Sequence, residues 1–216
     1  LDNKMKKILT ILLFTISLMS WATKYHVETT GNDGTGDGTS GNPWLTISYA
    51  ISQVFAGDTI MIGAGNFPIS AQMAVGVQIN FLGEGSSMSI LTANTTLSYF
   101  FTLYSVSEGT NGNQFFKHIG FDGNLTTEKG IESRGRSNII IDSCSFTQFN
   151  GEAVSLNGRY TGEGAPTVWA TGLKVMNSTF INCGSDAYYS EYSSWFASGA
   201  IGLSGDQDAE IIHNYI

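Results

Sequence analysis

Four short segments repeat one pattern and decide the fold: FKHIGF (116–121), IDSCSF (141–146), VMNSTF (175–180) and IIHNYI (211–216). Their first and sixth positions are apolar in every case, whereas the third is always a polar residue. The segments start 25, 34 and 36 residues apart, an irregular period typical of stacked solenoid coils. A coil of this size cannot bury its apolar side chains alone, so it must stack on its neighbours. The repeat therefore predicts an all-β solenoid in which equivalent residues lie above one another.

The third position of the repeat is occupied by His118, Ser143, Asn177 and His213. The two histidines could approach a metal ion. One polar position per coil is instead typical of a ladder of internal side chains that satisfy one another's hydrogen bonds at a bend. We therefore favour a structural ladder over a metal site at this position.

Composition narrows the range of partners. The 216 residues are 42% hydrophobic and 13% charged, and the formal net charge is −8. Ten Lys and Arg stand against eighteen Asp and Glu, and no basic cluster follows the first seven residues. A nucleic-acid partner is therefore not expected.

The start of the chain has the order of a secretory signal peptide. Met5-Lys6-Lys7 precedes an apolar run over 8–19, and small residues follow at Ser20 and Ala22. The run is too short to span a membrane. Residues 1–22 are therefore interpreted as upstream residues and a signal peptide, so we expect a secreted or cell-surface monomer without a membrane span.

The next segment, residues 23–57, is interpreted as a cap. A glycine-rich loop over 31–41 is followed by Asn42 as a helix N-cap, by Pro43 and by apolar spacing that predicts a helix over 43–55. The loop contains Asn32, Asp33 and Asp37, oxygen-bearing residues that could bind Ca2+. It lacks the full calcium-loop pattern, so a simple entry loop is favoured.

The segment AGDTIMIGAGNF (56–67), which follows the expected helix, carries a family resemblance. Together with the preceding loop and helix it resembles the N-terminal cap and first coil of right-handed parallel β-helix proteins of the pectate-lyase-like superfamily. The resemblance implies a right-handed single-stranded parallel β-helix over residues 58–216. We expect this solenoid to be incomplete at its C-terminus, because an end at Ile216 would leave an open sheet edge.

The resemblance also implies a secreted carbohydrate-active protein, foremost a polysaccharide lyase that cleaves an acidic, uronate-containing glycan by β-elimination. Such chemistry needs a base and a cation that stabilises the enolate-like charge. Lys117 and Asp142 share an outward position in successive coils, and Arg134 and Arg136 precede the Asp142 strand. We interpret Lys117, Arg134 and Arg136 as catalytic candidates clustered with Asp142, although ordinary ion pairs would explain the same residues.

Acidic residues near the repeat strands offer a second hypothesis. Carboxylates that gather on one outer face could hold Ca2+ and bridge it to an acidic sugar, and Asp142 and Asp186 are the candidates. Such carboxylates could also serve as an acid/base pair in glycoside hydrolysis. The simpler alternative is a solvated acidic face made of Asp122, Asp142, Glu152, Asp186, Asp206 and Asp208.

The inserted loops of the later coils carry aromatic residues suited to stacking on sugar rings. The candidate substrate-binding residues are Tyr160, Trp169, Tyr188, Tyr192 and Trp195. Packing of the loops onto the solenoid is an equally good explanation for them.

Two cysteines, Cys144 and Cys183, occupy different positions of adjacent coils. A disulfide between them is possible but not favoured, and buried thiols are the preferred interpretation.

Two further functions remain open beside the lyase. One is a non-catalytic glycan-binding or structural surface β-helix, and the other is a glycoside hydrolase. Fold alone does not decide among them.

Overall fold

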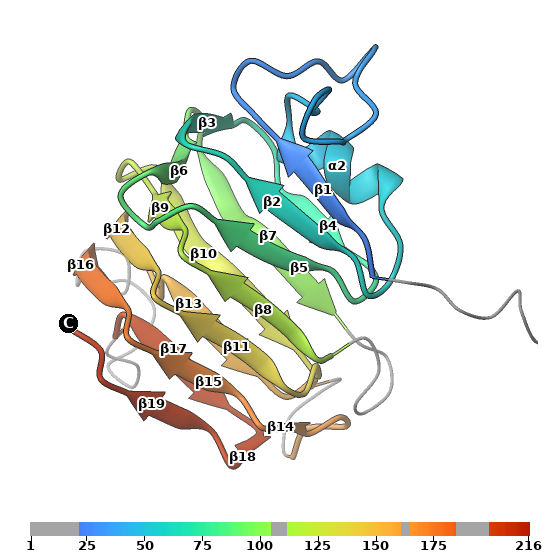
Figure 1. Cartoon of the computed structure of the whole chain (residues 1–216). Helices are drawn as coiled ribbons and strands as arrows, with labels where there is room; N and C mark the ends of the chain where they lie inside the picture. The colour runs from blue at the N-terminus through green and yellow to red at the C-terminus, as the bar shows by residue number, and fades with distance from the viewer. Residues whose placement is uncertain (1–21, 105–111, 161–164, 185–198) are drawn as a thin grey trace, which may run out of the picture.

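The computed structural model describes residues 22–104, 112–160, 165–184 and 199–216 (Figure 1). Within this part of the chain nearly all regular structure is β-strand, with one short helix, α2 (Ile47–Gln53). All pairs between the named strands are parallel. The predicted all-β fold is thus confirmed.

The strands form three large parallel sheets. Sheet 1 consists of β1 (Lys24–Val27), β2 (Thr59–Ile62), β5 (Asn80–Gly83), β8 (Gln114–Lys117), β11 (Ile139–Asp142), β15 (Lys174–Met176) and β19 (Glu210–Ile212). Sheet 2 consists of β3 (Gly65–Ile69), β6 (Ser89–Ala93), β9 (Gly120–Asp122), β12 (Ser145–Phe149) and β16 (Thr179–Cys183). Sheet 3 consists of β4 (Met73–Val75), β7 (Leu97–Tyr104), β10 (Thr127–Arg134), β13 (Val154–Asn157) and β17 (Ile201–Ser204).

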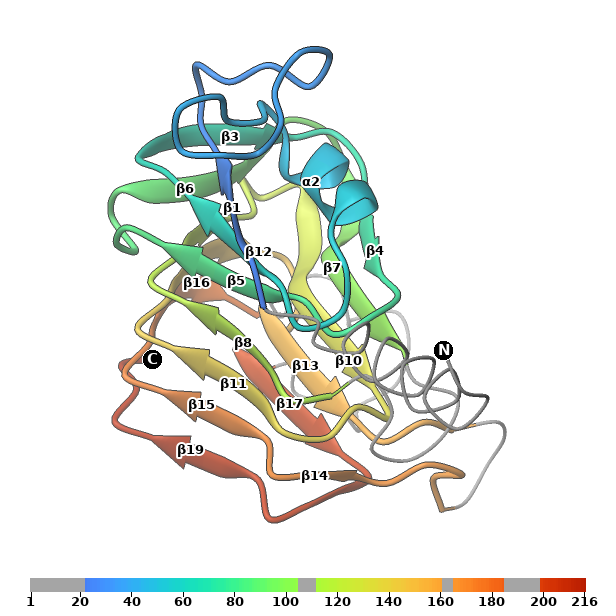
Figure 2. The same cartoon turned by 45° about the vertical axis from the view of Figure 1, so that its right-hand side comes forward.

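The chain visits the three sheets in the same order again and again. β2, β3 and β4 form one coil, β5, β6 and β7 the next, and the series continues through β17. In the later coils β14 (Ala170–Thr171) pairs with β18 (Asp206–Gln207) as a small extra sheet. Figure 2 shows the coils stacked below the N-terminal helix, with sheet 1 and sheet 3 on different sides.

Equivalent apolar residues stack in the interior, as the repeat predicts. In sheet 1 the first repeat position places Phe116 in register with Ile141, and Ile141 in register with Val175. In sheet 2 the sixth position stacks the Phe146 ring on its neighbours at 4.6 and 5.0 Å. Burial of each such phenylalanine contributes about 2–3 kcal/mol, and each ring pair adds about 1 kcal/mol. These columns hold the coils together.

The polar third position of the repeat lies at the bend between sheet 1 and sheet 2. All four of its residues have positive φ, from 51° at Asn177 to 58° at His118. This conformation turns the chain, and it leaves both histidines and Asn177 exposed. The prediction of an internal ladder at this position is therefore wrong.

The ladder exists one residue further along the chain, because the residue after the bend points inward. The backbone N–H of Cys144 donates to Oγ of Ser178 at 3.1 Å. The N–H of Ser178 donates in turn to Oδ1 of Asn214 at 2.9 Å. Side chains of successive coils thus satisfy the backbone donors that the bend leaves open.

The helix of the cap is shorter than the one predicted over 43–55. The helix begins at Ile47 with Thr46 as its N-cap, because Asp33 accepts hydrogen bonds from the N–H groups of Leu45 and Thr46 and from the Thr46 hydroxyl. Trp44, expected inside the helix, instead stacks on Tyr25 at 5.1 Å. The glycine-rich loop is thus held by its own hydrogen bonds, and it fixes α2 on the first coil.

Both cysteines are free thiols. Burial raises the pKa of the Cys144 thiol to about 12. Cys183 is only partly buried. Within the described residues, no helix is long and apolar enough to cross a membrane; the expected signal peptide lies outside them, apart from its last residue.

Candidate functional site

The structure separates the four residues expected in one catalytic cluster. Lys117 and Asp142 lie on the outer face of sheet 1, whereas Arg134 ends β10 in sheet 3 and Arg136 is buried. Arg134 is the last residue of that strand, eight residues before Asp142 in the sequence. Two left-handed residues, Gly135 (φ 75°) and Asn138 (φ 56°), lie between β10 and β11 and turn the chain from sheet 3 to sheet 1. The two faces therefore point in different directions.

Arg136 is a structural residue in the interior, fully buried at 0% exposure. Its guanidinium donates to Oε1 of Gln114 at 2.5 Å, to the carbonyl of Tyr104 at 3.2 Å and to the carbonyl of Val75. Burial lowers the pKa of Arg136 to about 10. The side chain joins the ends of β4 and β7 to the start of β8, so it cannot touch a glycan.

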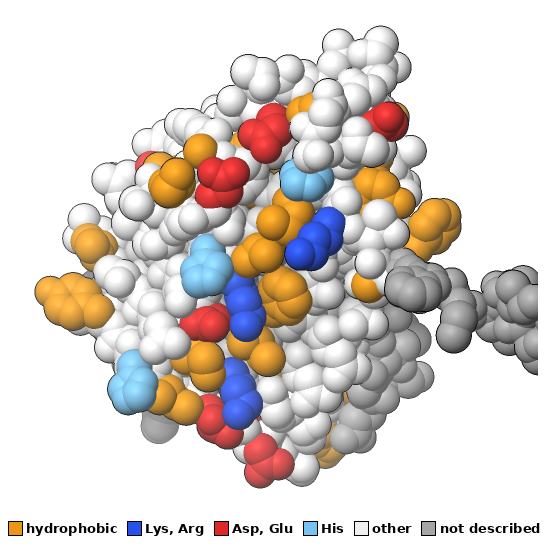
Figure 3. Space-filling model, viewed as in Figure 1, with side chains coloured by type: hydrophobic (Ala, Val, Ile, Leu, Met, Phe, Trp, Pro, Cys, Tyr) orange, Lys and Arg blue, Asp and Glu red, His pale blue; other side chains and the backbone are white. Residues whose placement is uncertain are grey.

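Lys117 and Asp142 form an ion pair across neighbouring strands, with Nζ 3.6 Å from Oδ2. Burial would raise the pKa of Asp142, but hydrogen bonds from Asn177 and Ser143 and the charge of Lys117 together hold it below its usual value. Figure 3 shows this face, on which basic and acidic side chains alternate with apolar ones. Oδ1 of Asp142 already accepts hydrogen bonds from Oγ of Ser143 and from Nδ2 of Asn177, each at 3.0 Å.

The structure does not add metal ligands beside Asp142 among the described residues. Asp186 lies outside the described residues. Among the residues that are described, no three His, Cys, Asp or Glu side chains gather closely enough to hold a metal ion.

A polar groove lies instead on the outer face of sheet 3, with a volume of about 520 Å³. We call it the sheet 3 groove. Its lining consists of Lys129, Glu132, Arg134, Glu152, Ser155, Asn157, Gly158, Tyr160, Gly199, Ile201, Gly202, Leu203 and Ser204. These residues come from three neighbouring strands, β10, β13 and β17, and from the segments beside them. The solenoid therefore builds the groove from several coils.

Strand register explains how the charged side chains meet. Outward positions of β7, β10, β13 and β17 form two columns: Thr102, Glu132, Ser155 and Gly202, then Tyr104, Arg134, Asn157 and Ser204. Lys129 lies in register with Tyr99 at the other end of β10. Tyr99 and Tyr104 thus lie on the strand next to β10, the charged residues lie on β10 itself, and small residues and Asn157 lie on β13 and β17.

Glu132 is the centre of a charge network, and its side chain is only 1% exposed. Oε1 accepts a hydrogen bond from Nη2 of Arg134 at 2.8 Å, and Oε2 accepts one from the Tyr104 hydroxyl at 3.1 Å. Nζ of Lys129 lies 3.5 Å from Glu132 and 3.5 Å from Glu152. A buried carboxylate thus fixes two cations, which is the arrangement that a buried charge requires.

The protonation of the network follows from its surroundings. Burial lowers the pKa of Lys129, but Glu152, Glu132 and Glu128 outweigh this and raise it above its usual value. Burial and the charge of Glu132 raise the pKa of both Tyr99 and Tyr104. At neutral pH Lys129 is therefore a cation and the two tyrosines are neutral, so none of the three is a ready base.

The part of the groove formed by β13 and β17 is its floor, which carries small uncharged residues. Nδ2 of Asn157 donates to Oγ of Ser155 at 2.8 Å, and Oγ of Ser204 donates to Oδ1 of Asn157 at 2.9 Å. Gly202 lies under the carboxylate of Glu152, because a Cβ atom at Gly202 would meet Oε1 at 2.4 Å. This floor leaves room for a ligand next to Glu152.

The aromatic candidates are only partly placed by the structure. Tyr160 lines the groove and is 41% exposed. Trp169 is half-buried and is absent from the lining of the groove. Tyr188, Tyr192 and Trp195 lie outside the described residues.

Four residues of the network were not predicted from the sequence, namely Lys129, Glu132, Tyr99 and Tyr104, and Glu152 was expected only as part of a general acidic face. One signal was available: Glu132 and Arg134 are two residues apart, so in a strand they share a face. The segment TEKGIESR (127–134) was not predicted as a strand, because glycine and charged residues disfavour one.

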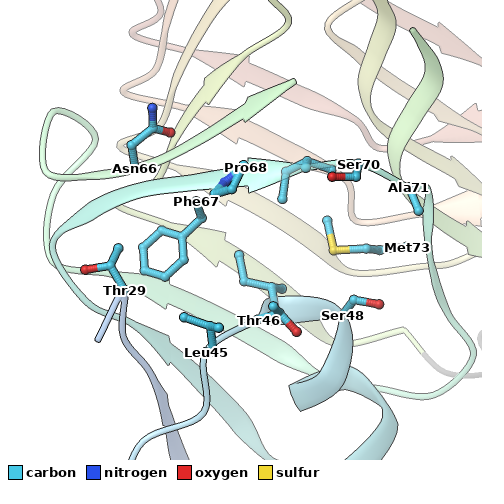
Figure 4. A pocket seen from close by; sticks show the side chains of 12 residues that line it. Thr29, Leu45, Thr46, Ser48, Asn66, Phe67, Pro68, Ser70, Ala71 and Met73 are labelled. Atoms are coloured by element: carbon cyan, nitrogen blue, oxygen red, sulfur yellow. The ribbon is translucent and has the colours of Figure 1, made fainter. Parts of the chain in front are cut away.

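A second cavity, of about 420 Å³, lies between the cap and the first coil (Figure 4). Its most buried lining residues are Ile47, Phe67, Ile69 and Met73, and its rim carries Thr29, Thr46 and Ser70. No charged side chain lines this cavity. It lacks the groups needed for acid/base chemistry.

Comparisons with known proteins were made for the whole chain. No protein-family model matches it, and no curated protein is similar to it in sequence. Among solved structures, a rhamnogalacturonan lyase is similar with a TM-score of 0.38 and 14% sequence identity. The match covers 90% of this chain and 63% of the lyase, so it spans less than two thirds of the lyase's own length. A similarity at this level assigns no function.

Proposed function

We infer that the protein is an exported, carbohydrate-active right-handed parallel β-helix that binds an acidic polysaccharide in the sheet 3 groove. The observation that carries this inference is the groove itself, where Arg134 and Lys129 lie beside the accessible carboxylate of Glu152. The three parallel sheets, visited in a constant order, support the β-helix. Export through residues 1–22 remains a proposal, which the mass of the secreted chain would test by showing cleavage after Ala22.

Arg134 is suited to bind the carboxylate of a uronate. Its side chain is 46% exposed and lines the groove, and its hydrogen bond to Glu132 uses Nη2, so the guanidinium has further N–H groups with which to bind a ligand. The guanidinium also lies over the Tyr104 ring at 5.4 Å, which limits its motion. A planar fork held in this way can bind a carboxylate through two parallel hydrogen bonds.

Glu152 is the group that can act as the base of a β-elimination. Its side chain is 27% exposed, compared with 1% for Glu132. It would take the proton next to the uronate carboxylate, while the C–O bond to the leaving sugar breaks and a C=C bond forms. Lys129 and Arg134 would stabilise the negative charge that develops on the carboxylate. The leaving oxygen would take its proton from water.

The geometry favours elimination over glycoside hydrolysis. Hydrolysis uses two carboxyl groups that both reach the substrate. Glu132 and Glu152 are near one another, because each lies 3.5 Å from the same ammonium group. Glu132 is enclosed by Arg134, Lys129 and Tyr104, however, so only Glu152 is open to a sugar.

The experiment uses the full-length exported protein and a panel of pectic, alginate and glycosaminoglycan polymers. Elimination gives an unsaturated uronate, which absorbs in the ultraviolet, together with new reducing ends. New reducing ends without the absorbance would indicate a hydrolase. Saturable binding without either product would indicate a glycan-binding protein and would remove the enzymatic proposal.

A further inference from the structure

The sheet 3 groove has an unusual arrangement for a site that handles acidic sugars. The carboxylates near the repeat strands suggest Ca2+ as a candidate cofactor, and Ca2+ takes six to eight oxygen ligands. In the groove, two carboxylates come together at Glu132 and Glu152, but the ammonium group of Lys129 lies between them, 3.5 Å from each. The donor set therefore does not fit a calcium ion, because a protein cation already pairs with both carboxylates and Arg134 adds a second positive charge beside Glu132.

Lys129 is held at this point from several directions. Its side chain is 14% exposed, and its ammonium group lies 6.0 Å from the centre of the Tyr99 ring. Oε1 of Glu132 is fixed in turn by Arg134. If the ammonium group moved away, Glu132 would keep Arg134, but Glu152 would lose the cation that it pairs with, which is unfavourable in a partly buried site.

We propose that the ammonium group of Lys129 is the built-in cation of the sheet 3 groove, and that acidic glycans are bound and cleaved there without Ca2+. The ammonium group supplies the positive charge that would otherwise come from a metal bridging carboxylates and sugar. The raised pKa of Lys129 agrees with this role, because it keeps the group protonated at neutral pH. The part played in cleavage rests on the proposed function, whereas the cation site itself does not.

The test compares the full-length wild-type protein with Lys129→Met, in CaCl2 and in EDTA. The wild-type melting temperature and cleavage rate should be the same in both conditions. Lys129→Met should lose about a hundredfold or more of the cleavage rate in EDTA. The melting temperature of this variant should also rise with CaCl2, because no ammonium group then lies between Glu132 and Glu152.

Lys174→Met is the matched control. Lys174 pairs with one carboxylate, Glu210 at 3.0 Å, on sheet 1. We expect this variant to cleave at the wild-type rate and to show no response to Ca2+. Lys129→Arg keeps a cation at this position, so its cleavage rate should be the same in CaCl2 and in EDTA.

Two results would overturn the proposal. One is a wild-type protein that Ca2+ stabilises, with the stabilisation lost in Glu152→Gln. The other is a Lys129→Met protein that cleaves at the wild-type rate in EDTA. If Lys129→Met fails to fold, the calcium titration of the wild type and Glu152→Gln decides the question. If the wild type cleaves no polymer, the proposed function fails, and the same titration still tests the cation site.

Discussion

The outer faces of sheet 1 and sheet 3 carry charges of both signs, yet they use them differently. On sheet 1 the charges form separate surface pairs, Lys117 with Asp142 and Lys174 with Glu210. On sheet 3 one buried carboxylate, Glu132, joins Arg134 and Lys129 into a network that faces a groove. Isolated surface pairs contribute little, whereas a buried network fixes its members in place. The candidate site is therefore distinguished by a buried carboxylate and by the ion pairs that connect its charges, more than by the number of charges.

The largest difference between the two faces is expected in the cleavage rate when a carboxylate is replaced on each of them. Glu152→Gln keeps the size of the side chain but removes the proposed base, so the cleavage rate should fall by about 10²- to 10⁴-fold. Initial rates on the best polymer measure this effect. Glu210→Gln, which changes an exposed carboxylate of sheet 1, is the matched control and should retain the wild-type rate. Equal rates in the two variants would remove Glu152 from the site.

The two arginines expected in one cluster should behave in opposite ways. Arg136→Met leaves buried carbonyl groups of Val75 and Tyr104 without their donor, so the free energy of unfolding should fall by about 3 kcal/mol. Arg134→Met should cost less than this, because the buried Glu132 keeps Lys129 and the Tyr104 hydroxyl as partners, but it should abolish glycan binding. Chemical denaturation and binding isotherms give both values. A stable Arg136→Met protein that has lost glycan binding would reverse the assignment.

The floor of the groove offers a sharper comparison between two glycines. A methyl group at Gly202 would collide with the Glu152 carboxylate, whereas one at Gly199 would meet only backbone at 3.6 Å. Gly202→Ala should therefore lower the cleavage rate about tenfold by displacing Glu152, with little change in KM. Gly199→Ala should match the wild type in both kcat and KM. A Gly202→Ala protein with wild-type kcat would show that the position of Glu152 is unimportant.

The smallest effect is expected for the sheet 1 pair. The pKa of Asp142 lies below its ordinary value of 3.8, so the carboxylate stabilises the fold above that pH and the contribution disappears as the pH falls further. Asp142→Asn should cost less than about 1 kcal/mol at neutral pH. The difference in unfolding free energy between the variant and the wild type should vanish under strongly acidic conditions. The cleavage rate should not change, and a large loss would return this pair to the catalytic site.

Much of the fold follows from the sequence, because stacking imposes the same requirement on every coil. Phe116, Ile141 and Val175 had to be apolar to share one column, and the repeat shows it. The helix start was less visible, because Asp33, thirteen residues before Thr46, fixes it through the glycine-rich loop. A local pattern cannot show a contact of this kind.

The candidate site could be predicted only in part, because its position depends on where the chain bends. Gly135 and Asn138 form the turn that places Arg134 and Asp142 in different sheets. Neither residue alone predicts a turn of this kind from the sequence. Glu132 is a buried charge in a strand of low strand propensity, so general rules place it at the surface. Only the register of β10 with β7 and β13 reveals its partners.

The most direct test of the account is a crystal structure of Glu152→Gln with a bound uronate oligosaccharide. We expect the sugar in the sheet 3 groove, with a carboxylate on Arg134 and a ring next to the side chain of residue 152. A sugar bound instead on the outer face of sheet 1, beside Lys117 and Asp142, would contradict the central claim.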